Sequence, residues 1–270
     1  MISHIIWDVN PEIFDGIVVL RWYGVCWVLG IILGQRIMVG ICESEGITAV
    51  EVDRLTLYII VGAIIGARLG HILFYDPIYY LRNPIEILPI RIEPTFQFTG
   101  FAGLASHGGV VGALLALFIY QRRSDKSYLW LLDRLIIPGA AVGGFIRLGN
   151  LMNSEMIGTP SDLPWAFVFT HVDNIPRHPS QLYEAIFYFV VCVLLYFTWR
   201  SGRFNSKTGF IFGLGMTLIF TQRFLVEFIK IDQVPFEENL VLNMGQVLSI
   251  PMILAATALV IWSSVKYRND

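Results

Sequence analysis

Residues 135–158 read LIIPGAAVGGFIRLGNLMNSEMIG, an apolar run that ends in a polar cluster. The cluster begins at Arg147 and includes Asn150, Asn153 and Glu155. These side chains either cap a helix buried in a soluble core or form a functional group at the edge of a membrane. The solvent around the apolar run distinguishes the two interpretations, and the composition of the whole chain indicates that solvent.

The composition is that of a membrane protein. Of the 270 residues, 55% are hydrophobic and only 15% are charged, whereas about a quarter of the residues in a soluble domain are charged. The mean hydropathy is +0.63. The net charge of −2 gives no basic surface, so we expect no nucleic-acid partner. The three cysteines lie far apart without disulfide or zinc spacing, and we expect them to be packing residues.

Seven segments approach the length of about 20 apolar residues that a membrane-spanning helix needs. They are 17–39, 55–75, 103–121, 134–150, 182–199, 209–228 and 245–264. The sequence therefore predicts an all-α polytopic membrane protein, with residues 1–270 forming one integral-membrane domain. We expect the first span to be retained, because the N-terminus lacks the basic leader of a secretory signal and the span is too long for one.

Positive charges gather in the connections on one side of these spans. The basic regions are 121–134, 200–208 and the C-terminus. The acidic N-terminus and the stretches 76–102, 151–181 and 229–244 alternate with them on the other side. By the positive-inside rule, the N-terminus lies outside and the C-terminus lies in the cytoplasm. The stretches 76–102 and 151–181 are long enough to form a small outward-facing head.

Ionisable side chains from several spans are expected to reach one level of the membrane, near its outer face. Four arginines lie in or beside the spans: Arg21, Arg68, Arg147 and Arg223. His107 lies at a similar depth, and Glu227 follows Arg223 by four positions on the same helical face. The alternative is that each arginine extends independently to the lipid headgroups, which suits Arg21 best. A shared site is favoured, because intramembrane charges usually mark function.

An arginine-rich site at headgroup depth suits a phosphate, since guanidinium groups bind phosphate oxygens through paired charge-assisted hydrogen bonds. The phosphate available at that depth belongs to an anionic phospholipid. His107 suits general-base chemistry near neutral pH, although a membrane histidine is more often a structural hydrogen-bonding group. The neighbouring Gly108, Gly109 and Gly112 are better explained by helix packing than by ligand approach.

Several other functions fit the sequence less well. A transporter that binds an anion is the main rival, but no internal repeat is evident and the charges gather near one face rather than at the midplane. A lipid-binding scaffold without catalysis is a third possibility. His171 and His178 lack further clustered ligands, so no metal site is expected. The chain has no Gly-x-Ser-x-Gly motif, which argues against a serine hydrolase.

Seven motifs together resemble one known family. They are RWYG (21–24), GARLGHILFY (66–75), HGG (107–109), RLGNLMNSEMIGTPSDLPW (147–165), HPSQLYE (178–184), RFLVEF (223–228) and MGQVLSIPM (244–252). In order and approximate spacing they are similar to prolipoprotein diacylglyceryl transferases, over almost the whole chain. The long block at 147–165 and HPSQLYE are the most specific of the seven.

The resemblance implies an activity and a location. Members of this family move the diacylglyceryl group of phosphatidylglycerol onto the lipobox cysteine of a prolipoprotein, which forms a thioether and releases glycerol phosphate. The implied partners are phosphatidylglycerol and the signal-peptide region that contains the lipobox cysteine, and no cofactor is implied. The implied location is the bacterial cytoplasmic (inner) membrane, with the active site near the outer leaflet.

The resemblance also assigns roles to residues at matching motif positions. His107 is the candidate general base for the thiol, and an arginine-rich pocket that lowers the thiol pKa is the alternative to it. Arg147 and Arg223 are expected to grip the phosphate and to stabilise the leaving group, with Glu155 and Glu227 orienting them. The remaining expected lipid-binding residues are Tyr23, Arg68, Asn150, Asn153 and Gly158.

Overall fold

The computed structural model describes residues 4–14, 20–88, 90–91, 97–98, 103–231 and 241–266. It forms two compact units, the first made of Met1–Ile41 and Leu129–Asp270 and the second of Cys42–Tyr128. The helices of the first unit are α1 (Trp22–Ser44), α5 (Tyr128–Met152), α6 (Ser180–Arg200), α7 (Phe210–Val226) with the short helix η2 (Glu227–Ile229), and α8 (Met244–Lys266). The main helices of the second unit are α2 (Ala49–Phe74) and α4 (Ser106–Gln121).

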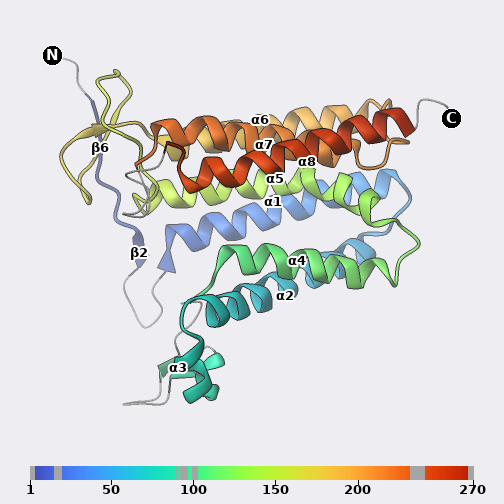
Figure 1. The fold of residues 1–270 in the computed structure, drawn as a ribbon, viewed down its shortest axis with the longest axis horizontal. Helices are drawn as coiled ribbons and strands as arrows, with labels where there is room; N and C mark the ends of the chain where they lie inside the picture. The colour runs from blue at the N-terminus through green and yellow to red at the C-terminus, as the bar shows by residue number, and fades with distance from the viewer. Residues whose placement is uncertain are drawn as a thin grey trace. The chain divides into compact units, whose positions relative to one another are not determined.

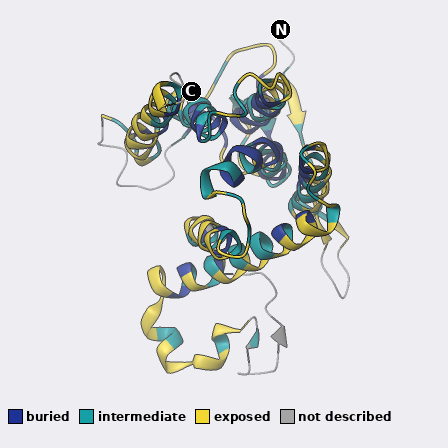
Figure 2. Ribbon diagram, turned by 90° about the vertical axis from the view of Figure 1, so that its right-hand side faces the viewer, coloured by how far each residue is buried: buried dark blue, intermediate teal, exposed yellow. Residues whose placement is uncertain are grey.

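Among the described residues, six helices are long and apolar enough to cross a membrane: α1, α2, α5, α6, α7 extended through η2, and α8. The chain is therefore a mostly helical, multi-pass membrane protein. Exposed residues recur along these helices (Figure 2). Large apolar residues are among them, including Leu57, Leu73, Phe197 and Leu254. Exposed apolar surface on this scale is typical of helices that face lipid.

The helix boundaries differ from the predicted spans at several ends. The helices α2 and α5 each begin six residues before the predicted start, and α1 and α4 differ further. The first span was expected at 17–39, but α1 runs from Trp22 to Ser44, because Leu20 and Arg21 form the strand β3 and pair with β2 (Glu12–Phe14). The predicted span at 103–121 corresponds to α4, whose 16 residues make a helix about 24 Å long. This helix is shorter than the other six.

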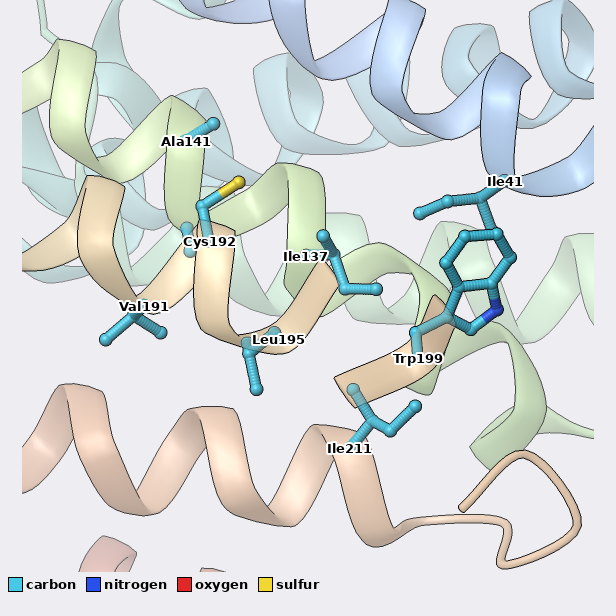
Figure 3. Close-up of a cluster of buried hydrophobic side chains, with 9 residues drawn as sticks. Ile41, Ile137, Ala141, Val191, Cys192, Leu195, Trp199 and Ile211 are labelled. Atoms are coloured by element: carbon cyan, nitrogen blue, oxygen red, sulfur yellow. The ribbon is translucent and has the colours of Figure 1, made fainter. Parts of the chain in front are cut away.

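The core of the first unit lies between α1, α5, α6 and α7. Figure 3 shows Ile41, Ile137, Val191, Leu195 and Ile211 pointing toward one another from these four helices. Glycines on the same helices allow close approach, since a Cβ at Gly30 of α1 would lie 3.0 Å from the Phe145 Cβ of α5. The helices lie alongside one another (Figure 1), and α5 is the most buried of the six candidate spans.

Side chains from neighbouring elements satisfy two helix N-termini in the first unit. The buried carboxylate of Asp133 in α5 accepts hydrogen bonds from the backbone N–H groups of Gly209 (2.6 Å) and Phe212 (2.8 Å) at the start of α7. Asn243 and Gln246 cap α8 reciprocally, each side-chain oxygen accepting from the other residue's backbone N–H. Asp133 therefore fixes α7 to α5, and the cap fixes where α8 begins.

A three-stranded sheet lies at the end of the first unit where α5 stops and α6 starts (Figure 1). Its strand order is β1 (Ile5–Trp7), β6 (Phe167–Phe169) and β7 (Pro176–Arg177), with β1 parallel and β7 antiparallel to β6. The indole N–H of Trp7 donates to the carbonyl of Leu151, 3.1 Å away. This contact joins the N-terminal strand to the last turn of α5.

The second unit is built on close contact between α2 and α4. Gly62, Gly66 and Gly70 of α2 face Gly108 and Gly112 of α4, and a Cβ at Gly66 or Gly112 would overlap backbone atoms of the other helix. Packing, rather than ligand approach, thus explains the glycines next to His107. Gly109 is different, because a Cβ there would make an ordinary contact of 3.4 Å with Ala67.

The chain between α2 and α4 contains short elements only. They are α3 (Pro77–Arg82), the 3₁₀ helix η1 (Pro84–Ile87), β4 (Ile90–Arg91) and β5 (Gln97–Phe98), and β4 pairs antiparallel with β5. This region is one of the two segments predicted to form an outward head. Residues 89, 92–96 and 99–102 of that predicted head lie outside the described residues.

Candidate functional site

The site in the first unit begins in the last turns of α5. Arg147 and Asn150 are three residues apart on one helical face, and the guanidinium donates to the Asn150 side-chain oxygen at 3.3 Å. The amide groups of Asn150 and Asn153 each donate to one oxygen of the Glu155 carboxylate, both at 3.1 Å. Asn150 therefore links Arg147 to Glu155.

A strained turn brings Glu155 back to the helix end. Ser154 and Met156, on either side of it, have φ angles of 54° and 56°, which side chains other than glycine adopt only at an energetic cost. The start of α6 holds this turn in place. The hydroxyl of Ser180 donates to the Met156 carbonyl at 2.6 Å, and the amide of Gln181 donates to the Glu155 carbonyl.

A second group of charged side chains adjoins Arg147. Glu184 of α6 lies 3.4 Å from the Arg147 Nε and 3.0 Å from the ammonium group of Lys230. The same ammonium lies 3.4 Å from Glu227. We call Arg147, Glu184, Glu227 and Lys230 the buried charge cluster, because their side chains are between 1% and 15% exposed. Charges this buried need partners, which the cluster supplies internally.

The cluster is also attached to the start of α8. The side-chain amide of Asn243, which caps α8, donates to the other oxygen of Glu227 at 3.1 Å. A Cβ at Gly245 would lie 2.7 Å from the Glu227 carboxyl carbon, so only glycine leaves room for that carboxylate. Four elements, α5, α6, η2 and α8, therefore converge on the buried charge cluster.

The pairing differs from the one expected from the sequence. Glu155 was expected to orient Arg147, and it does so only through Asn150, while Glu184 makes the direct contact. Glu227 was expected to orient Arg223, four positions earlier, but its described partners are Lys230 and Asn243. In each case a direct partner comes from another element of the fold and not from the same helical turn.

Arg223 makes no hydrogen bond or ion pair with another residue in the described part of the chain. Its charge and that of Arg147 both act on the hydroxyl of Tyr188 in α6, and Tyr188 also shares a side-chain hydrogen bond with Arg147. The ring of Tyr188 lies against Gly143 of α5. Two arginines and a tyrosine are therefore near one another.

Sequence reasoning missed Glu184, Lys230 and Tyr188 as members of the site. Glu184 ends the motif HPSQLYE, and Lys230 lies in the stretch 229–244 that was predicted to face outward. A signal was present in the sequence, since a glutamate inside an otherwise apolar segment needs a partner. Nothing local identified that partner, which lies 46 positions away.

Tyr23 and Gly158 occupy positions that require close packing. The ring of Tyr23 in α1 lies against Gly149, where a Cβ would be 2.8 Å from the ring. The N–H of Gly158 donates to the His178 carbonyl at 3.0 Å, and Gly158 also forms a β-bridge with Lys230. Gly158 therefore joins the chain after α5 to the chain before α6 and the chain after α7.

An ion pair outside the spans supports the same segment. Arg177 of β7 contacts the Asp173 carboxylate with two of its nitrogens, at 2.6 and 3.0 Å, and donates to the Gly158 carbonyl at 3.3 Å. The hydrogen bonds from Arg177 lower the pKa of Asp173 below its usual value. Nearby, His171 contacts Asp8 and His178 contacts Tyr183, and the described residues contain no cluster suited to a metal ion.

The other two predicted site residues, Arg68 and His107, belong to the second unit. Arg68 of α2 donates to the backbone carbonyls of Glu86, Ile87 and Gly103, and it lies over the ring of Tyr80. Its guanidinium therefore fastens the two ends of the connection between α2 and α4. His107 is exposed in the first turn of α4. The contacts of Arg68 named here all lie within the second unit.

The ends of several membrane-length helices surround the buried charge cluster. This arrangement defines the class of the protein. It is a multi-pass membrane protein with an arginine site of the kind that suits an anionic group. The chain belongs to the prolipoprotein diacylglyceryl transferase family, because the sequence model of that family matches residues 11–262. The family resemblance predicted from the motifs is thereby confirmed.

Curated relatives support the same assignment over nearly the full length of the chain. A protein of Tolumonas auensis is 44% identical over 260 residues, which cover 96% of this chain and 97% of the relative. One of Chloroherpeton thalassium is 43% identical and covers 98% and 96%, respectively. One of Bacteroides fragilis is 44% identical and covers 92% and 91%. Each is named phosphatidylglycerol–prolipoprotein diacylglyceryl transferase.

Proposed function

We propose that this chain transfers the diacylglyceryl group of phosphatidylglycerol to the lipobox cysteine of a prolipoprotein, the first step of bacterial lipoprotein maturation. The observation that supports the proposal best is Arg147. In a chain of this family, its guanidinium lies at the end of a membrane-length helix, and its contacts with Asn150 and Glu184 are long, at 3.3 and 3.4 Å. Such a group has donors left for a phosphate.

The reaction breaks one bond and forms one. The cysteine sulfur, as thiolate, attacks the glyceryl carbon that is bonded to the phosphate oxygen of the lipid. A C–S thioether bond forms, the C–O bond breaks, and its electron pair leaves with glycerol phosphate. The thiol proton passes to a base and from there to solvent or to the leaving group. Negative charge increases on the phosphate as the bond breaks, so cations around it stabilise the transition state.

The site residues take the following roles in this proposal. Arg147 and Arg223 bind the phosphate and stabilise the leaving group. Asn150, Asn153 and Glu155 hold the end of α5 and present hydrogen-bonding groups to the lipid headgroup. His107 is the candidate base for the thiol.

Three further residues support these groups. The hydroxyl of Tyr23 contributes a hydrogen bond to the lipid. Gly158 permits the tight packing after the turn, and Glu227 balances positive charge near Arg223. Arg68, which we initially expected to bind the phosphate, has its donors occupied by backbone carbonyls, so its proposed role is to fasten the segment between α2 and α4.

We further propose the arrangement of the chain in the membrane. Residues 1–270 form one integral-membrane domain of the bacterial inner membrane, with seven spans that include α4. The N-terminus is outside, the C-terminus is in the cytoplasm, and the active site lies near the outer leaflet. The segments 76–102 and 151–181 form the small outward head. The support is the distribution of arginine and lysine among the connections.

The test is a transfer assay with purified protein. Phosphatidylglycerol and a lipobox peptide are supplied, and the peptide mass is followed for addition of diacylglyceryl to cysteine. We expect addition with phosphatidylglycerol and none with a peptide whose cysteine is replaced by serine. Absence of any addition, with both substrates shown to bind, would rule the transferase out and favour a lipid-binding scaffold or an anion transporter.

Single-turnover rates test the assigned roles. We expect Arg147→Ala and Arg223→Ala each to lower the rate by about a hundredfold or more, the usual loss when a group that stabilises transition-state charge is removed. His107→Ala should be impaired most at low pH, where little thiolate forms unaided. A His107→Ala variant that kept its full rate at every pH would exclude His107 as the base.

A further inference from the structure

Lys230 is more deeply buried than Arg147, and no step of the proposed reaction uses it. Its side chain is 3% exposed and its ammonium contacts two carboxylates, Glu184 at 3.0 Å and Glu227 at 3.4 Å. Arg147 contacts the same Glu184, but at 3.4 Å. Lys230 therefore holds the shared carboxylate more closely than Arg147 does.

The geometry of the Arg147 contact is correspondingly weak. The Glu184 oxygen that faces Arg147 is buried and accepts no hydrogen bond from a described residue, so the pair is not the two-bond arrangement that arginine and carboxylate normally favour. An unhindered carboxylate beside a buried guanidinium would be expected to close that gap. Lys230 donates to the other oxygen of Glu184, 3.0 Å away.

The charges of the cluster lead to the same conclusion. Two cations, Arg147 and Lys230, balance two carboxylates, Glu184 and Glu227. Without the charge of Lys230, a single guanidinium would face both carboxylates in a poorly solvated site, where attraction between opposite charges is strong. Arg147 would then pair fully with Glu184, which would take two of its N–H donors and turn the guanidinium toward the carboxylate and away from an incoming phosphate.

We infer that Lys230 is a positioning residue that keeps Arg147 available for the phosphate of the lipid substrate by occupying Glu184 and Glu227. The inference rests on the proposed function. Lys230 does not touch the substrate in this arrangement and acts through Glu184. It follows that the charge of Lys230 matters more than its shape, and that its loss is offset by neutralising Glu184.

Steady-state kinetics with both substrates varied test this inference. Lys230→Met keeps the backbone groups and most of the apolar stem of the side chain, and removes the charge with its hydrogen-bond donors. We expect it to raise the KM for phosphatidylglycerol about tenfold or more, while the KM for the lipobox peptide stays within about twofold; a tenfold change corresponds to about 1.4 kcal/mol of binding free energy. Lys230→Arg should restore the KM to within about threefold of the parent value.

Glu184→Gln gives the decisive comparison. A purely structural Lys230–Glu184 contact is broken by either substitution, so both variants, and the double variant, would show the same defect. Our inference predicts effects of opposite sign instead. Glu184→Gln should leave the KM for phosphatidylglycerol unchanged or lower, and the double variant K230M/E184Q should return it to within about threefold of the parent value.

Lys207→Met is the matched control, since Lys207 precedes α7 and Lys230 follows it, a separation of roughly 25 Å along the helix. It should leave both KM values unchanged. Three results would overturn the inference in an active parent enzyme: an unchanged KM for K230M, a K230M defect confined to kcat, or a raised KM for E184Q. If K230M does not accumulate as folded protein, E184Q alone still decides. An inactive parent enzyme would instead overturn the proposed function.

Discussion

At Gly158 the surrounding atoms leave room for a hydrogen atom but not for a Cβ. A Cβ at this position would lie 2.6 Å from the His178 carbonyl oxygen and 2.7 Å from that of Ile229. Both neighbours are backbone atoms, so neither can rotate away. We expect Gly158→Ala to destabilise the protein by about 1–3 kcal/mol, the usual cost of overpacking, and to lower transfer activity because Gly158 pairs with Lys230.

The measurement is the thermal unfolding midpoint in detergent, with transfer activity assayed in parallel. Gly139→Ala is the matched control, since nothing lies within 4 Å of a Cβ added at Gly139. Alanine there should leave the midpoint unchanged or raise it slightly, because alanine favours the helix over glycine. Equal effects of the two substitutions would show that the space around Gly158 is less restricted than we describe.

The ion pair between Asp173 and Arg177 makes part of the stability dependent on pH. Hydrogen bonds from Arg177 lower the pKa of Asp173 in the folded protein, whereas the unfolded chain has a value of about 3.9. The pair therefore adds its full stability above about pH 4, and this contribution is lost as the pH falls through the lower folded pKa. Unfolding midpoints of the parent and of Asp173→Asn should differ at pH 7 and converge below pH 4. A difference that stays constant down to pH 3 would contradict this.

At the residue level, the sequence identified part of the site and could not identify the rest. Arg147, Asn150 and Glu155 lie within eight positions, so helical spacing and one turn bring them together. Glu184 and Lys230 are 46 positions apart, and no periodicity relates them. Their contact depends on how the start of α6 meets the end of α7, which is a property of tertiary packing.

Among the elements, α2 and α4 depend on glycine for their contact. A Cβ at Gly112 would overlap the carbonyl oxygen of Gly62 and lie 2.8 Å from the Cα of Gly66. We expect Gly112→Ala to separate the two helices and to lower the unfolding midpoint by several degrees, since small residues permit helix contact in membranes. Gly109→Ala, on the same helix, should have little effect, because its Cβ would meet Ala67 at 3.4 Å. Equal shifts would argue against the glycine contact.

Helix positions were more predictable than the strands between them. Apolar runs located α6, α7 and α8 to within a few residues, since length and hydropathy define a span. The pairing of β1 with β6 joins segments about 160 positions apart, and strands of three residues have no detectable alternation. The start of α1 was misplaced for a related reason, because β3 uses the apolar Leu20 for pairing with β2.

For the whole molecule, the decisive question is whether α4 crosses the bilayer. Its 16 residues span about 24 Å, against about 30 Å of hydrocarbon. Short spans are accommodated when flanking basic residues extend to the headgroups or the bilayer thins, and Arg122 and Arg123 directly follow α4. The connection after α4 and the one between α6 and α7 lie on the same side in either case, because α5 and α6 separate them. If α4 crosses, the connection between α2 and α4 lies on the opposite side from these two basic connections; if it does not, all three lie on one side.

Cysteine labelling in spheroplasts distinguishes these arrangements. In a parent with Cys26, Cys42 and Cys192 replaced by alanine, the exposed positions Asn83, Asp125, Asp162 and Ser206 are changed to cysteine one at a time. We expect a membrane-impermeant maleimide to label Asn83→Cys and Asp162→Cys directly, and to label Asp125→Cys and Ser206→Cys only after lysis. Labelling of Asn83→Cys only after lysis, as for Asp125→Cys, would mean that α4 does not cross. Labelling of Asp162→Cys only after lysis would invert the orientation and place the arginine site at the cytoplasmic face, where a translocated lipobox cysteine could not reach it.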